Sequence, residues 1–156
     1  MRLAIDQWEV DADVEATRAI YQLTRRGSPG DCDCLTCRNF LALGDSAFPA
    51  VFRELTEKLG IDHHKAAEIH EWCDFNDSQL DYGGWFHFLG SIQAGATLAT
   101  SSSSVEQWPW YKLTGDFKII IDTRKDLAFP EFDGHPLVRL EFHAREPWVL
   151  PEPYPQ

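Results

Sequence analysis

The sequence predicts an α+β fold, with a mostly antiparallel sheet and two or three short helices packed on one side of it. The chain has 156 residues, which is enough for one domain with a sizeable core and too few for two comfortable ones. Helical spacing of apolar residues is concentrated in the first half of the chain, whereas apolar and polar residues alternate in the second half. This segregation argues against alternating βαβ units.

Breakers and apolar spacing define the expected helices. Residues 13–24 and 35–43 are predicted to be helical, separated by a Gly-Pro breaker before the cysteines. A further helix ends at Gly60, which suits the position just after a helix. Its apolar stripe is Val51, Phe52, Leu55 and Leu59. Asp62 is expected to cap another helix over 63–73, with Ala66, Ile69, Trp72 and Cys73 facing inward.

The expected strands cover residues 1–10, 82–92, 113–122 and 137–145, and residues 93–107 are expected to connect two of them as a loop. In the last strand, Val138, Leu140 and Phe142 alternate with polar residues, which predicts a half-buried strand. We therefore expect a single domain over residues 1–146, followed by a Pro-rich C-terminal tail over 147–156.

The net charge of the chain limits the classes of partner that it can bind. Lys and Arg total 14 against 25 Asp and Glu, so the formal net charge is −11. Such a chain repels phosphate backbones and anionic lipid, so neither nucleic acid nor a membrane is expected as a partner. Asp6 and Glu9 exclude an apolar signal core at the N-terminus, and the expected location is the cytoplasm.

Cys32, Cys34 and Cys37 form a C-x-C-x2-C cluster, which is the feature of the sequence that most clearly indicates a chemical site. The spacing allows all three sulfurs to face one centre, and tetrahedral zinc needs a fourth ligand. Cys73 is the first candidate for that ligand, and His70, His63 and His64 are alternatives. The cluster predicts a zinc site, most simply a structural one.

Two other interpretations of the cluster stay open. The cysteines can be small, partly buried apolar residues in a tight turn. They can also be redox-active, because Cys34 begins a predicted helix whose dipole lowers a thiol pKa, with Cys37 as its partner. Asp31 and Asp33 argue against the redox interpretation, because neighbouring carboxylates raise a thiol pKa.

Several residues outside the cluster have both a functional and a plain structural interpretation. The pair His63 and His64 can bind a metal or shuttle protons, or can simply lie exposed in a first helical turn. His87 can be a tuned base or a core histidine that makes one hydrogen bond. Gly83 and Gly84 favour a β-bulge at the start of their strand over close approach of a ligand.

The aromatic group Trp108, Trp110 and Tyr111 is a candidate contact surface for a protein partner, a small ligand or a second copy of the chain. Packing against the sheet is the plainer interpretation. The chain has no dinucleotide, P-loop, metalloprotease or nucleophile-elbow motif, so no catalytic residue is assigned.

Four segments together resemble a family of bacterial proteins to which no function is assigned. They are C-D-C-L-T-C-R-N-F at 32–40, L-G-I-D-x-x-K at 59–65, Y-G-G-W-F-H-F at 82–88 and E-P-W-V-L at 146–150. The resemblance spans roughly residues 30 to 150 and implies a bacterial, cytoplasmic, single-domain protein. It carries over no catalytic residue, and Cys73 lies outside its pattern. The function expected is a binding or interaction module with a structural zinc site, and the alternative is a thiol-based redox protein or enzyme.

Overall fold

The computed structural model describes residues 1–76, 78–96 and 108–155, with the side chains of residues 73–76 outside the description. Its strands are β1 (Arg2–Ile5), β2 (Trp8–Ala12), β3 (Glu68–Asn76), β4 (Gln79–Ala94), β5 (Tyr111–Thr114), β6 (Phe117–Asp122) and β7 (Leu137–Pro147). Its α-helices are α1 (Val14–Leu23), α2 (Ser28–Asp31), α3 (Leu35–Leu43) and α4 (Ala50–Leu59), and η1 (Gly44–Ala47) and η3 (Pro130–Phe132) are 3₁₀ turns. The α+β prediction is confirmed.

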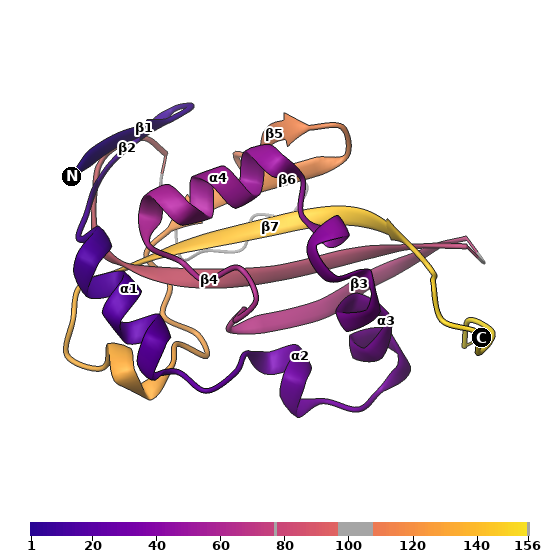
Figure 1. Cartoon of the computed structure of the whole chain (residues 1–156). Helices are drawn as coiled ribbons and strands as arrows, with labels where there is room; N and C mark the ends of the chain where they lie inside the picture. The colour runs from indigo at the N-terminus through magenta and orange to yellow at the C-terminus, as the bar shows by residue number, and fades with distance from the viewer. Residues whose placement is uncertain (77, 97–107, 156) are drawn as a thin grey trace.

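The described strands form one seven-stranded antiparallel sheet (Figure 1). Six strands follow the order β1-β2-β4-β7-β6-β5, and the seventh, β3, pairs with β4 beside this path. The long strand β4 organises it. One edge of β4 pairs with β7 along residues 79–89. Its other edge pairs first with β3 along residues 79–85 and then with β2 along residues 90–94.

Helix α1 fills the gap that β2 and β3 leave along that edge of β4. The hydroxyl of Tyr21 donates to the carbonyl of His87 at 2.9 Å and accepts from its N–H at 3.3 Å. The N–H of Leu89 donates to Thr17 Oγ1 at 3.0 Å, and the carbonyl of Leu89 accepts from the N–H of Asp13 at 2.8 Å. Backbone groups that no strand pairs are therefore satisfied by a helix.

Aromatic side chains join α3, η1 and α4 to one face of the sheet. Phe48 lies 5.3 Å from the ring of Phe142 in β7, and Phe52 lies 4.8 Å from that of Phe117 in β6. Phe40 packs against Tyr82 of β4 at 5.2 Å. Such pairs add specific ring contacts to apolar burial. We call the opposite side, which carries Trp85, the far face.

Three predicted elements differ in the structure. Residues 68–76 form strand β3, so the helix predicted over 63–73 is wrong. The apolar spacing of three residues also fits a strand when Ile69 and Trp72 lie on opposite faces, and pairing with β4 decides between the two. The expected strands over 1–10 and 113–122 are each hairpins, β1–β2 and β5–β6, which turn at residues 6–7 and 115–116.

The other helices and the strands over 82–92 and 137–145 are confirmed within a few residues. Residues 93 and 94 of the expected loop belong to β4, and residues 97–107 lie outside the described residues.

The segment after β7 folds back against α3. Arg38 forms an ion pair with Glu152 at 2.7 Å, and the Tyr154 hydroxyl donates to Glu71 of β3 at 2.8 Å.

Candidate functional site

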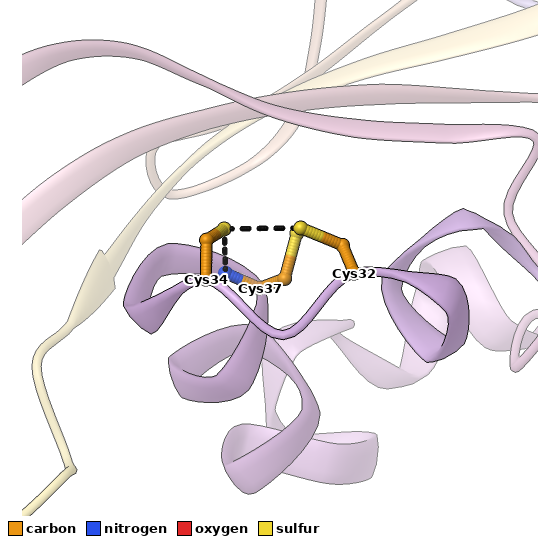
Figure 2. Close-up of side chains that lie close together, drawn as sticks. All are labelled: Cys32, Cys34 and Cys37. Carbon is orange, nitrogen blue, oxygen red and sulfur yellow. Dashed lines mark hydrogen bonds between the residues drawn. The ribbon is translucent and has the colours of Figure 1, made fainter.

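The three cysteines of the C-x-C-x2-C cluster lie at the junction between α2 and α3. Cys32 follows the last residue of α2, Cys34 is the N-cap of α3, and Cys37 lies in its first turn. Figure 2 shows the three side chains together on one side of this junction. Their sulfurs all lie within 4.8 Å of one another, and all three are free thiols.

The helix start gives the three thiols different environments. Cys34 is exposed, and its Sγ accepts from the N–H of Cys37 at 3.4 Å and from the Sγ of Cys32 at 3.2 Å. The hydrogen bond from the Cys37 N–H is the largest effect that lowers the pKa of the Cys34 thiol. Cys37 is buried, and burial raises the pKa of its thiol. The cluster thus holds one accessible sulfur and one enclosed sulfur.

The donor set fits a thiophilic metal ion. Sulfurs around tetrahedral zinc, at the usual bond length of about 2.3 Å, lie roughly 3.8 Å apart. The observed separations, 3.2 Å for Cys32 and Cys34 and at most 4.8 Å for every pair, need only small side-chain adjustments to reach that value. The cluster is therefore positioned to hold a metal ion.

Neither His63 nor His64 joins the three thiols, nor does His70, among the described side chains. His63 and His64 group with Asp45 instead. His70 lies on the far face, next to Trp72 and Trp85, whereas its neighbour Glu71 reaches Thr36 of α3 on the helix side. Cys73 lies in β3, and its side chain is outside the described part of the structure.

Buried polar contacts anchor the helix that carries Cys37. Asn39 is fully buried, and its side chain donates to the Tyr82 hydroxyl and to the carbonyl of Pro147, both at 3.1 Å. The N–H of Val149 donates to Asn39 Oδ1 at 2.7 Å. The Tyr82 hydroxyl in turn donates to the carbonyl of Thr36 at 2.8 Å. Helix α3 is thereby fixed to β4 and to the C-terminal segment.

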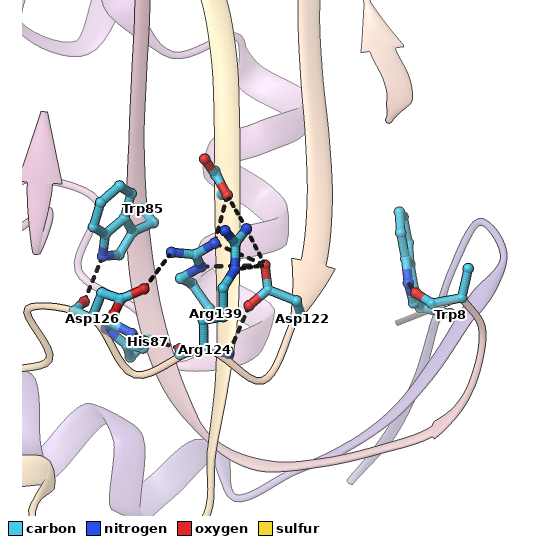
Figure 3. Close-up of polar contacts among 9 residues, drawn as sticks. Trp8, Trp85, His87, Asp122, Arg124, Asp126 and Arg139 are labelled. Atoms are coloured by element: carbon cyan, nitrogen blue, oxygen red, sulfur yellow. Dashed lines mark hydrogen bonds and ion pairs between the residues drawn. The ribbon is translucent and has the colours of Figure 1, made fainter. Parts of the chain in front are cut away.

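A buried ion network on the far face was missed by the sequence analysis. Arg139 is 1% exposed, and its Nη2 lies 2.9 Å from Asp122 and 2.8 Å from Glu141 (Figure 3). Arg124 bonds the same two carboxylates at 2.8 and 3.0 Å. Alternation made the polar side of β7 look like an ordinary solvated strand face. Pairing with β6 instead brings Asp122 opposite Arg139 and buries the charges.

Tryptophans border this network. The guanidinium carbon of Arg139 lies 4.8 Å from the ring centroid of Trp85, and that of Arg124 lies 4.5 Å from that of Trp108. Trp108 stacks on Trp110 at 6.0 Å, and Trp110 lies 6.2 Å from Trp72. These distances suit cation–π and ring contacts. Trp108 and Trp110 therefore belong to one aromatic surface with Trp72 and Trp85.

Tyr111, expected to share a surface with Trp108 and Trp110, lies on the other side of the sheet. It pairs with Ile119, whose neighbour in β7 is Phe142 of the helix side. It lines a hollow there together with Leu55 of α4.

Gly83 makes room for an aromatic side chain. A Cβ at this position would lie 1.7 Å from Nε1 of Trp72, so Trp72 packs directly on the backbone of β4. The expected bulge at Gly83 and Gly84 is not present, because pairing of β4 with β7 runs through both without a shift. The register shifts of the β3–β4 pair lie between Glu71 and Cys73 and between Asp74 and Asn76.

A cavity of about 500 Å³ opens on the far face beside the network. It is lined by Glu68, His70, Trp72, Trp85, Trp108, Arg124, Asp126, Leu127, Arg139 and Glu141. Burial lowers the pKa of His70 and raises the pKa of Glu141 to about 7.

His87 lies deeper and is fully buried. Its Nε2 lies 3.3 Å from the carbonyl oxygen of Arg124. This contact matches the interpretation of His87 as a core histidine with one hydrogen bond.

No protein-family model, curated protein or solved structure matches this chain. Within the described ranges, none of the helices has the length and apolar character needed to cross a bilayer.

Proposed function

We propose that this chain is a binding module in which Cys32, Cys34 and Cys37 hold a structural zinc ion. The observation that carries the proposal is the convergence of three thiol sulfurs within 4.8 Å at one helix start. Thiolates are soft ligands that select zinc over the hard cations magnesium and calcium. The Cys37 N–H already directed at Cys34 Sγ supports thiolate character there, as a metal ligand requires.

The position of the cluster supports a structural role for the metal. A zinc ion here would tie the end of α2 to the start of α3, and α3 carries Asn39 into the core. Cys73 remains the proposed fourth ligand. With four protein ligands the ion has no open position for water, so it contributes to folding rather than to chemistry.

Replacement of Cys34 tests the zinc site. In Cys34→Ser we expect the zinc content of chain purified under reducing conditions to fall by one equivalent. The free energy of unfolding should fall by about 3 kcal/mol when free zinc is a hundred times its dissociation constant. Metal content is measured by plasma mass spectrometry, and stability by urea unfolding with and without chelator.

Two further variants make this test specific. Asp33→Asn changes the exposed residue between two of the cysteines and should keep the metal. Cys73→Ser should weaken zinc binding if Cys73 is the fourth ligand. A wild-type chain whose zinc content after purification and zinc uptake in titration equal those of Cys34→Ser would overturn the proposal.

A thiol redox role is the second candidate, and one observation favours it. Cys34 is exposed, has a lowered thiol pKa and lies 3.2 Å from the sulfur of Cys32. Iodoacetamide labelling across pH separates the two functions. Protection of all three thiols by zinc supports the structural site, whereas rapid labelling of Cys34 in the zinc-loaded chain supports redox chemistry.

The far-face cavity is the proposed binding surface of the module. Both guanidinium groups there already bond Asp122 and Glu141, while Glu68 and Asp126 add negative charge at the rim. With tryptophan rings around them, these charges favour a small organic cation over an anion. The proposed ligand class is therefore a quaternary ammonium or guanidinium compound.

Choline tests this surface, with inorganic phosphate as the anionic comparison. We expect millimolar choline to raise the melting temperature of the wild-type chain, and phosphate at matched ionic strength to leave it unchanged. Asp126→Asn should weaken the choline effect, whereas Glu131→Asn, an exposed residue outside the cavity lining, should not. Equal effects of choline and phosphate would contradict the assignment.

A further inference from the structure

A second group of metal-ligating side chains lies at the two ends of α4. Asp45 belongs to η1, which precedes the helix, and His63 and His64 lie in the segment that follows it. Oδ1 of Asp45 is 2.9 Å from Nε2 of His63 and 2.9 Å from Nε2 of His64. Three candidate ligand atoms thus meet at one point, from positions 18 and 19 residues apart in sequence.

Both nitrogens of the His64 ring face a carboxylate oxygen. Its Nδ1 lies 3.0 Å from Oδ1 of Asp62, while its Nε2 faces Asp45. Carboxylates only accept, and a neutral imidazole carries a single N–H. A metal ion bound at Nε2 would leave the single N–H of the ring at Nδ1, where Asp62 accepts it.

The surroundings favour the metal. An imidazole that ligates a metal through one nitrogen usually donates its other N–H to a carboxylate, which fixes the tautomer and the ring orientation. Asp62 is placed for that task at Nδ1 of His64, and it also accepts the backbone N–H of His64 at 3.0 Å. His63 is held by an edge contact of 5.8 Å with Phe48, so both rings have fixed directions.

We propose that Asp45, His63 and His64 form a three-ligand site for a divalent first-row transition metal such as zinc. Two imidazoles and one carboxylate are a donor set that zinc and its neighbours accept. Ligand atoms at the usual zinc distances lie about 3.4 Å apart in a tetrahedron, so the Asp45 oxygen needs to separate from each imidazole nitrogen by only about 0.5 Å. Asp62 is the positioning residue.

This site differs from the thiol cluster in having an open coordination side. Three protein ligands leave at least one position for water or a small ligand. His63 and His64 also line a cavity of about 550 Å³ bounded by α1 and α4, which gives such a ligand room. His64 and Asp45 are 64% and 55% exposed, so an ion can enter directly from solvent.

Zinc and cobalt titrations of the full chain test the proposal. We expect the wild-type chain to bind one more equivalent of zinc than His64→Gln and Asp45→Asn, and the imidazole nitrogen resonances of His63 and His64 to shift on loading. Asp62→Asn should weaken this equivalent by about 10- to 100-fold. His135→Gln, an exposed histidine outside the group, is the matched control and should bind as the wild type does.

The readouts separate this site from the cysteine site. Cobalt bound by thiolates gives a charge-transfer band, which His64→Gln should retain and Cys34→Ser should lose. Unchanged zinc stoichiometry and affinity in both His64→Gln and Asp45→Asn would overturn the His–Asp site and leave the cysteine site standing. A wild-type chain that shows the imidazole shifts but no charge-transfer band would overturn the cysteine site and leave the His–Asp site standing.

Discussion

At the scale of single residues, the far face shows how a sheet can hold buried charge. Isolated ions are costly to bury, and each charge here has a partner of opposite sign. Arg139 contacts both Asp122 and Glu141, and Arg124 contacts the same two carboxylates from the rim. Asp126 adds a third carboxylate at the exposed rim, 3.6 Å from Nη1 of Arg139.

His87 predicts a specific pH dependence of stability. Burial lowers its pKa to about 4, below the value near 6.5 expected in the unfolded chain. Between those values the unfolded chain binds more protons, so stability falls as pH drops from 6.5 toward 4. From pH 7 to pH 5 the loss attributable to His87 is about 2 kcal/mol.

Urea unfolding of the wild type and His87→Gln at both pH values measures this contribution. Other buried groups, such as His70, His143 and Glu141, titrate in both chains and cancel in the comparison. The variant should lose less stability than the wild type on acidification. Equal losses would show that His87 is not kept neutral by burial.

At the scale of elements, α4 shows agreement between local sequence and tertiary contact. Its buried positions Phe52, Thr56 and Leu59 follow the helical period. Gly60 ends the helix in the left-handed region, with φ +78°, and its N–H bonds the last turn. This cap is also a packing point, because a Cβ on Gly60 would lie 2.4 Å from the carbonyl oxygen of Val14 in α1.

Gly60→Ala should therefore cost more than backbone strain alone. A non-glycine residue in the left-handed region costs about 1–2 kcal/mol. Gly115 has φ +49° and open space around its Cβ position, so Gly115→Ala should show only that cost. Chemical denaturation of both variants gives the comparison. Matched losses would mean that α1 moves aside without penalty.

At the scale of the whole molecule, the C-terminal segment closes the structure over α3. Asn39 is fully buried, and its Oδ1 accepts from Val149, which lies beyond the last strand. The two residues that make this hydrogen bond are 110 positions apart in the sequence. The segment therefore stabilises the helix that follows the cysteine cluster.

Deletion of residues 148–156 should lower the free energy of unfolding by at least about 1–3 kcal/mol, the cost of leaving one buried acceptor unpaired. The deletion also removes Trp148 and Tyr154, which pack against the core, and the ion pair of Glu152 with Arg38. Val149→Ala keeps the backbone N–H and should stay close to the wild type. Thermal and urea unfolding of both chains test this. A deletion that leaves stability unchanged would show that water replaces the Val149 N–H.

Sequence periodicity predicted the strands with clean alternation and the helices with clear caps, because those signals are local. It failed over residues 63–73, where a three-residue apolar spacing fits a helix and a strand equally. It also treated Arg139 and Glu141 as ordinary polar positions of a half-buried strand. Their burial depends on Asp122 and Arg124, which join them only when β6 pairs with β7.

The sequence by itself determined the α+β class, the sheet-forming segments other than β3, and the grouping of Cys32, Cys34 and Cys37, because these depend on residues only a few positions apart. Only the tertiary structure decided which distant groups meet. It brought Asp45 to His63 and His64, set Trp110 beside Trp72, and separated His70 from the cysteines. Such contacts depend on strand register and helix docking, which fix the positions of side chains far apart in the chain.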